Sequence, residues 1–433
     1  MVQPSSESRG IPLSAADLLP PPFRPLPIRL LNAAGRAAGG LDRYAFRLDE
    51  ASLLEAAMRA AGTRDVGPDT FLPGFRTLLR SLEEDARLST FGRFFARRQL
   101  LELLTHRLRI YEYRRRHPEV SQERIRRPIF ILGLPRTGTT LLLGLLAEDR
   151  AHRAALSWEV DEPCPPPRTP YYETDPRIEA TRARFEQLQQ LAPGFQAIHP
   201  IGERMPQECI VLTAPEFMSI RFEMCFDVAS YQRWLPEQDM TGAYDFHKAF
   251  LQHLQSGHAG ERWVLKSPGH LGAIDALFEA YPDAIVIQTH RDPVRVVPSV
   301  ASLEYTMRQV SSDAVDPERL GRQQLWMWSR VLEQGLESRR EHPEREAQIL
   351  DLSMGEIVRD PLGTAERIYR RFDLPWNEDT RSRMQAYLAR HPKDEFGPHR
   401  YSLDAFGLAE EEVDQHFKQY RDYFDIEREP PPR

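Results

Sequence analysis

The segment from Pro128 to Leu146 constrains the fold of this chain more than any other part of its sequence. Four apolar residues at 129–132 predict a buried strand, a turn with two glycines follows at 133–138, and an apolar run from Thr139 predicts a helix. In this order the backbone N–H groups of the helix N-terminus face the turn, and the helix dipole favours an anion there. The segment therefore predicts a phosphate-binding loop.

The same loop departs from the usual nucleotide-binding pattern at one place. Gly133 and Gly138 are separated by four residues, as in a Walker loop. A Walker loop continues with Lys and then Ser or Thr, whereas this chain has Thr139 and Thr140. The lysine that reaches the β- and γ-phosphates of ATP or GTP is therefore missing. We expect the loop to hold a phosphate of a different kind of ligand.

Apolar strands and helical patterns alternate along most of the chain. The sequence predicts strands at 129–132, 154–158, 263–265, 284–289 and 348–352, with helices between them. Such alternation is typical of α/β proteins, in which helices cover both faces of a parallel sheet. We therefore predict a P-loop-like, doubly wound parallel sheet.

Two helical regions accompany this predicted sheet. Residues 1–25 are rich in Ser, Pro and Gly and predict a flexible lead, and a helical extension is expected from there to residue 125. The α/β domain is expected at 126–433. Within it, a helical insertion at about 160–260 separates the second predicted strand from the third.

Ionisable residues follow four of the predicted strands. Arg136 comes after the first strand, Glu159 after the second, Lys266 after the third and Arg291 after the fourth. Ligands of doubly wound sheets bind at the carboxyl ends of the strands. We therefore expect these four side chains to meet at one edge of the sheet.

The fourth predicted strand carries a second phosphate-binding signal. It leads into His290-Arg291-Asp292-Pro293, and Ser299 lies eight residues beyond Arg291 on the following helix. A guanidinium group matches phosphate oxygens in a bidentate manner, and a nearby hydroxyl can complete the contact. The pair predicts a grip on a second phosphate. Lys266, at the end of the third strand, is placed to neutralise charge on a group in transfer.

Composition limits the remaining classes of function. The 433 residues carry a net charge of −7, so bulk charge gives no support to a nucleic-acid partner. Three dispersed cysteines have no metal-ligand spacing, so we expect no metal and a reducing, cytoplasmic setting. The sequence shows neither a signal segment nor an apolar run of about 20 residues, so no membrane span is expected. Self-association into a homo-oligomer is left open.

Together, residues 133–140 and 290–299 resemble the paired motifs of the sulfotransferases that use 3′-phosphoadenosine 5′-phosphosulfate (PAPS). The Lys266-Ser267-Pro268 element is similar to the lysine-bearing strand end of the tyrosylprotein and bacterial branches of that family. The resemblance spans about 126–310 and extends more weakly to about 425. It implies transfer of a sulfuryl group to a hydroxyl or amine of a small-molecule or lipid-like acceptor, with PAP as the desulfonated product.

The resemblance also implies roles for particular residues. The loop would bind the 5′-phosphosulfate, Arg291 and Ser299 the 3′-phosphate, and a segment around Arg400 would close over the nucleotide. Lys266 and Arg136 would stabilise charge on the leaving oxygen and the sulfuryl group. The residues expected to contact the donor are Arg136, Thr137, Gly138, Thr139, Thr140, Lys266, Arg291, Ser299 and Arg400.

A base must take the proton of the acceptor; Glu159 is predicted to be this base, and His199 is the rival candidate. Glu159 follows the second predicted strand, where related branches carry a catalytic Glu. His199 lies in the insertion that should cover the acceptor, and other branches use a His. Glu208, nearby in the sequence, is interpreted as a helix-start residue.

Two other functions remain as alternatives. A P-loop kinase-like phosphotransferase would bind ATP with Mg²⁺, which the missing Walker lysine argues against. A non-catalytic nucleotide-binding protein with a sulfotransferase fold would not need the residues at Glu159 and Lys266.

Overall fold

A parallel sheet forms the centre of the computed structural model, which describes residues 18–191, 202–392 and 400–429. Within these residues the sheet has five strands in the order β2-β3-β1-β4-β5, and every neighbouring pair is parallel. The strands are β1 (Ile129–Gly133), β2 (His152–Arg153), β3 (Arg262–Lys266), β4 (Ile285–His290) and β5 (Ile349–Ser353).

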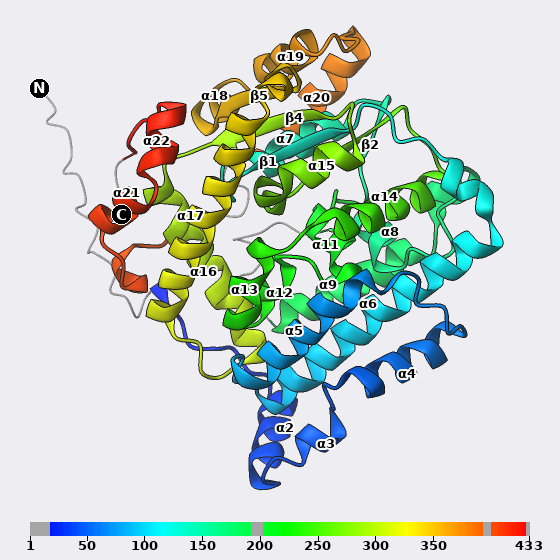
Figure 1. Cartoon of the computed structure of the whole chain (residues 1–433), viewed down its shortest axis with the longest axis vertical. Coiled ribbons are helices and arrows are strands. Elements are labelled where there is room, and N and C mark those ends of the chain that lie inside the picture. The colour runs from blue at the N-terminus through cyan, green and yellow to red at the C-terminus, as the bar shows by residue number, and fades with distance from the viewer. Residues whose placement is uncertain (1–17, 192–201, 393–399, 430–433) are drawn as a thin grey trace, which may run out of the picture.

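Helices cover both faces of this sheet, so the predicted doubly wound fold is confirmed (Figure 1). Alternate residues of β1 point to opposite faces, as strand geometry requires: Ile129 and Ile131 pack with one set of helices, Phe130 and Leu132 with the other. The first set is α7 (Thr139–Ala147), α18 (Met354–Arg359), α19 (Pro361–Arg371) and α20 (Glu378–Arg390); the second includes α14 (Thr241–Gln255), α15 (Ile274–Ala280), α16 (Pro293–Ser311), α17 (Pro317–Glu341), α21 (Glu410–His416) and α22 (Lys418–Phe424).

The strand predicted at 154–158 is wrong. The edge strand β2 ends at Arg153, and the chain enters the short helix α8 (Ser157–Asp161). Glu159 stands at the third position of α8, and its side chain accepts a hydrogen bond from the backbone N–H of Leu156 at 2.9 Å. This contact satisfies an N–H at the helix start and stabilises helix over strand.

The insertion between β2 and β3 is helical, as predicted. After α8 it forms α9 (Arg177–Leu191), α11 (Cys209–Thr213), α12 (Arg221–Cys225), α13 (Ala229–Trp234) and α14. The helices α11 to α13 lie beyond the carboxyl ends of the strands, below the sheet in the view of Figure 1.

The N-terminal helices share a core with this insertion. They are α2 (Leu26–Ala37), α3 (Asp42–Ala45), α4 (Glu50–Ala61), α5 (Leu72–Glu84) and α6 (Thr90–Arg116). Side chains of α4, α5 and α6 pack with Phe217, Phe222 and Tyr231 of the insertion. A buried ion pair joins Arg107 of α6 to Glu216, and both side chains are 1% exposed.

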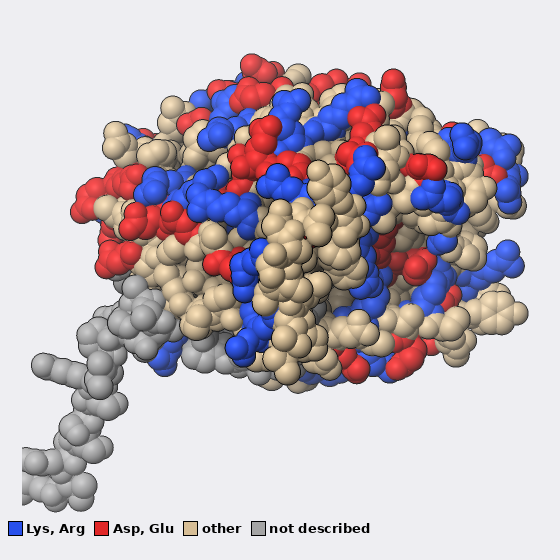
Figure 2. Space-filling view, turned by 90° about the horizontal axis from the view of Figure 1, so that it is seen from below, with Lys and Arg blue, Asp and Glu red and all other residues tan. Residues whose placement is uncertain are grey.

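The end of the molecule that carries α2 and α3 exposes several large apolar side chains. Uncharged residues form a projecting ridge there, flanked by Lys and Arg (Figure 2). Its exposed apolar side chains include Phe23, Leu26, Leu30, Leu41 and Tyr44. Nearby, Arg24 of the predicted flexible lead is anchored by an ion pair with Asp313 at 3.0 Å. Across the described ranges, every helix is too short or too polar to cross a membrane.

Candidate active site

The carboxyl ends of β1, β3 and β4 open into one pocket of about 260 Å³. The pocket contains six of the residues that the sequence singled out, namely Arg136, Gly138, Thr139, Thr140, Lys266 and Arg291. Its opposite wall comes from α12, α16 and α17. The sheet therefore brings the predicted phosphate-binding loop, Arg291 and Lys266 to one place, as the topology of parallel strands predicts.

Backbone geometry explains the two glycines of the loop. Gly133 has φ of +142°, and a Cβ at this position would lie 2.4 Å from the carbonyl oxygen of Thr289 on β4. Gly138 has φ of +85° and is the N-cap residue of α7. The loop therefore turns sharply against β4 and presents the N-terminus of α7 to the pocket, the arrangement that favours an oxyanion.

The Thr137 side chain points away from the pocket. It is fully buried, its hydroxyl lies 2.6 Å from the Thr289 hydroxyl, and it donates to the Leu134 carbonyl oxygen at 2.6 Å. The contact with Thr289 ties the loop to β4, and the bond to Leu134 closes a turn within the loop. Thr139 and Thr140 line the pocket instead.

Two arginines bring positive charge to the loop. Arg291 donates to the carbonyl oxygen of Arg136 at 3.1 Å. The Nε atom of Arg291 also pairs with the Glu429 carboxylate at 3.0 Å, so a carboxylate of the C-terminal segment is held by this guanidinium group. Burial lowers the pKa of Arg136, and the adjacent charge of Arg291 acts in the same direction.

Lys266 lies at the centre of the polar contacts in this pocket. It ends β3, is 3% exposed, and its Nζ atom lies 3.5 Å from the Thr140 hydroxyl. The ammonium group is ion-paired with the carboxylate of Glu208. Glu208 precedes α11, as a helix-start residue should, yet its side chain caps nothing and turns to Lys266. Sequence reasoning missed this role.

Glu159 is not brought to the pocket. It is fully buried in α8, where it is ion-paired with Arg153 and accepts a hydrogen bond from the Tyr172 hydroxyl at 3.1 Å. Arg153 in turn stacks over Trp263, with its guanidinium carbon 4.4 Å from the ring centroid. Glu159 was expected at the sheet edge because a strand was predicted at 154–158, and the structure has α8 in its place.

Two other predicted residues, Ser299 and Arg400, lie outside the lining of the pocket. Ser299 is buried on α16, and its hydroxyl has no hydrogen-bond partner among the described residues. Arg400 is exposed. His199 falls outside the described residues.

The structure adds two buried carboxyl groups to the wall of the pocket. Glu223 comes from α12 and Glu304 from α16. Glu304 accepts hydrogen bonds from Arg308 at 2.9 Å and from Gln324 at 2.8 Å. The sequence did not predict that either residue lines the pocket. Each lies on a helix, and the helix that it faces is distant along the chain. The described residues contain no cluster of three or more His, Cys, Asp or Glu suited to a metal ion.

Comparison of the sequence with known protein families identifies the family of this chain. The sequence profile of the sulfotransferase family matches residues 128–378, more than half of the chain. The chain belongs to the sulfotransferase family. It is a sulfotransferase enzyme, and the resemblance seen in its paired motifs is confirmed.

Mycobacterial proteins are among the relatives of this sulfotransferase. Omega-hydroxy-beta-dihydromenaquinone-9 sulfotransferase Stf3 of Mycobacterium bovis is 26% identical over 70% of this chain and 76% of its own length. The crystal structure of STF1 from Mycobacterium tuberculosis matches with a TM-score of 0.77 and 33% identity, over 86% of this chain and 98% of that one. The crystal structure of STF9 from Mycobacterium avium matches with a TM-score of 0.78 and 31% identity, over 87% of this chain and 96% of that one.

Proposed function

We propose that this enzyme transfers a sulfuryl group from PAPS to a hydroxyl group of a lipid-like acceptor. The observation that carries the proposal is the meeting of the 133–140 loop with Arg291, Lys266 and Glu208 around one pocket. Family membership supports the reaction class.

The residues around the loop fit a donor with two separate anionic groups. The N-terminus of α7, with the Thr139 and Thr140 hydroxyls, suits the 5′-phosphosulfate. Arg291 suits the 3′-phosphate, because its guanidinium group already holds a carboxylate. When bound, PAPS supplies the sulfuryl group and a phosphate leaving group. Arg136 and Lys266 supply positive charge where negative charge develops during transfer.

Two observations support a lipid-like acceptor. The relative Stf3 is an omega-hydroxy-beta-dihydromenaquinone-9 sulfotransferase. In this chain, the wall opposite the loop carries the apolar side chains of Ile220, Leu303 and Trp328 beside its two buried carboxyl groups. An apolar acceptor would bury its surface there, and its hydroxyl would point toward Lys266.

We assign the general base to Glu208. A base must lie within hydrogen-bond reach of the acceptor proton, and Glu208 lines the pocket beside Lys266. The acceptor oxygen forms the new bond to sulfur as the bond from sulfur to the phosphate oxygen breaks. The proton passes to the Glu208 carboxylate, and the electron pair of the broken bond stays on PAP, where Lys266 stabilises it.

Glu159 remains the alternative base from the sequence argument. To act, its carboxylate would have to leave Arg153 and Tyr172 and reach the pocket. His199 is the third candidate. Single variants separate the three assignments.

Titration calorimetry with PAP, PAPS, ATP and GTP tests the donor. We expect PAP and PAPS to bind in the micromolar range without Mg²⁺, and ATP and GTP to bind much more weakly. ATP binding without PAP binding would contradict the proposal and favour a phosphotransferase. Tight PAP binding with no transfer to any hydroxylated lipid would favour a non-catalytic protein.

Turnover with labelled PAPS tests the base. We expect Glu208→Gln to reduce kcat by at least about 100-fold while PAP affinity changes little, because the neutral amide cannot accept the proton. Glu159→Gln and His199→Ala should keep most activity once their folded fraction is matched by thermal unfolding. If Glu159→Gln or His199→Ala abolishes turnover and Glu208→Gln does not, the base is reassigned accordingly.

A further inference from the structure

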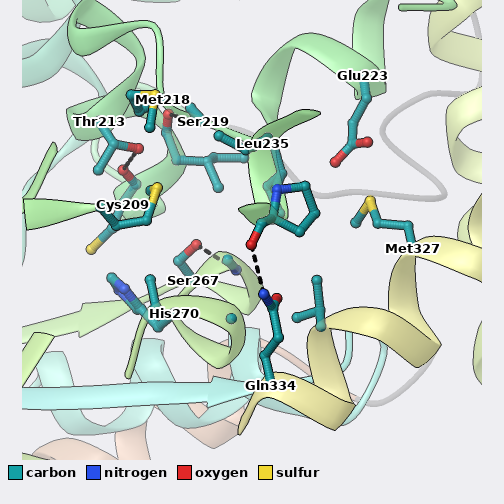
Figure 3. A pocket seen from close by; sticks show the side chains of 18 of the residues that line it. Cys209, Thr213, Met218, Ser219, Glu223, Leu235, Ser267, His270, Met327 and Gln334 are labelled. Atoms are coloured by element: carbon teal, nitrogen blue, oxygen red, sulfur yellow. Dashed lines mark hydrogen bonds between the residues drawn. The ribbon is translucent and has the colours of Figure 1, made fainter. Parts of the chain in front are cut away.

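A second cavity adjoins the proposed sulfuryl-transfer pocket. It lies between α11, α12, α13 and α17, next to the 3₁₀ turn η6 (Pro268–Ala273) that follows β3 (Figure 3). Its open volume is about 60 Å³. Five residues line both cavities, namely Ile210, Ile220, Glu223, Met327 and Trp328. The two cavities therefore share one wall.

The walls of the second cavity are apolar and adaptable. Met218, Met240 and Met327 contribute flexible thioether side chains, and Leu235 and Val331 complete much of the apolar surface. Methionine side chains rearrange at low energetic cost to fit ligands of different shape. The cavity can therefore enlarge around the apolar body of a ligand that enters from the transfer pocket.

Glu223 interrupts this apolar lining. Glu223 is 2% exposed, and neither of its carboxyl oxygens has a hydrogen-bond partner of good geometry among the described residues. In Figure 3 the carboxyl group projects from α12 toward the cavity, on the side of Met327. The Gln232 amide lies near this carboxyl group and also donates to the Met327 sulfur at 3.4 Å.

The surroundings of Glu223 favour its neutral form. Burial, followed by the negative charge of Glu304, raises the pKa of Glu223 well above its ordinary value, although Arg308 and the neighbouring Gln232 amide act in the opposite direction. Arg308 donates to the backbone carbonyl of Glu223 at 2.8 Å and to the Glu304 carboxylate at 2.9 Å. A protonated carboxyl group keeps an O–H donor, and a buried donor without an acceptor costs free energy.

We propose that the second cavity receives the apolar body of the acceptor, and that protonated Glu223 donates a hydrogen bond to a second acceptor oxygen, distinct from the one that is sulfated. The ligand class is an apolar molecule with a terminal hydroxyl and a carbonyl, ether or hydroxyl oxygen farther along. This inference rests on the proposed function, because it uses the hydroxyl-acceptor pocket beside Lys266. It adds a residue that determines specificity at the far end of the acceptor.

Calorimetry on the PAP-saturated full chain tests the inference with two matched probes, a long-chain alkanol and the hydroxyketone of the same length. The wild type should bind the hydroxyketone about tenfold more tightly, the ratio expected for one hydrogen bond to a buried group. Glu223→Gln keeps an N–H donor and should keep part of this preference. Glu223→Leu should abolish the preference and bind the alkanol more tightly than the wild type does.

Met240→Leu is the matched control, because it changes the cavity wall without changing a polar group. It should affect both probes equally. Equal preference ratios in the wild type and Glu223→Leu would overturn the inference, as would failure of both probes to bind. A PAP titration on each sample separates this outcome from failure of the proposed function, which would show as loss of PAP binding in the wild type.

Discussion

The contrast between Glu208 and Glu159 shows what the position of a single residue along the chain does and does not reveal. A glutamate before a helix predicts a capping role, yet the Glu208 side chain pairs with Lys266, 58 residues away. Glu159 performs the capping that would have been expected of Glu208. Local spacing does not reveal the pairing of Glu208, because its partner Lys266 lies on a different element.

At the same scale, Glu429 and a bound phosphate should compete for Arg291. Glu429→Gln removes the carboxylate that pairs with this guanidinium group. We expect PAP to bind about threefold more tightly to the variant, a modest gain because a partly exposed ion pair contributes roughly 0.5–1 kcal/mol. Titration calorimetry at constant ionic strength measures the change.

Glu427→Gln is the matched control for that variant. It lies in the same segment and is exposed, and removing its charge alters the general electrostatics by the same amount. If both variants change PAP affinity equally, the specific contact with Arg291 has no role.

At the scale of elements, the turn after β1 is the most sensitive point of the site. Gly133→Ala places a Cβ against the β4 backbone at Thr289 and imposes positive φ on an alanine. We expect the free energy of unfolding to fall by about 3 kcal/mol, and PAP affinity to fall at least about tenfold as the loop shifts. Denaturant unfolding and calorimetry measure the two effects.

Gly39→Ala provides the comparison. Gly39 also has positive φ, of +61°, but no atom lies within 4 Å of its ideal Cβ position. The free energy of unfolding of this variant should fall by about 1 kcal/mol, and its PAP affinity should not change. Equal losses in the two variants would show that contact with β4 is unimportant.

Sequence patterns predicted those elements whose signal is local and strong. The loop and strands β1, β3, β4 and β5 follow from apolar runs that end in turns. The edge strand β2 could not be predicted in this way, because it has only two residues and the apolar residues after it enter a helix. The signal for α8 was available in Glu159, three residues after Leu156, but an apolar run normally outweighs it.

At the scale of the whole molecule, the proposed acceptor side of the site could not be predicted from the sequence. Its cavities are assembled from α11, α12, α16 and α17, which are distant along the chain. The N-terminal helices support this assembly through a shared core and the Arg107–Glu216 ion pair. Pairings of helices depend on shape and burial, which a periodic pattern does not encode.

Buried histidines should make global stability depend on pH. Burial lowers the pKa of His253 to about 4, whereas an unfolded chain protonates its histidines near pH 6.5. As the pH falls from 6.5 to 4, the unfolded state takes up a proton that the folded state refuses, so this residue lowers stability. Between pH 7 and pH 5, the free energy of unfolding of His253→Gln should therefore fall by about 2 kcal/mol less than that of the wild type.

Denaturant unfolding at a series of pH values checks this difference. Comparing the variant with the wild type cancels other titrating groups, including Glu304, whose pKa burial raises to about 7. Parallel stability curves for the two proteins would show that His253 is protonated in the folded state as readily as in the unfolded one.

The contact between Arg291 and Glu429 also makes the C-terminal segment an internal reporter. If phosphate displaces the carboxylate, the segment loses an anchor beside the site whenever nucleotide enters. A fluorophore attached near residue 427 would then change its anisotropy on PAP binding. Such a signal would time nucleotide entry and departure directly, in the absence of any acceptor, and so separate these steps from sulfuryl transfer.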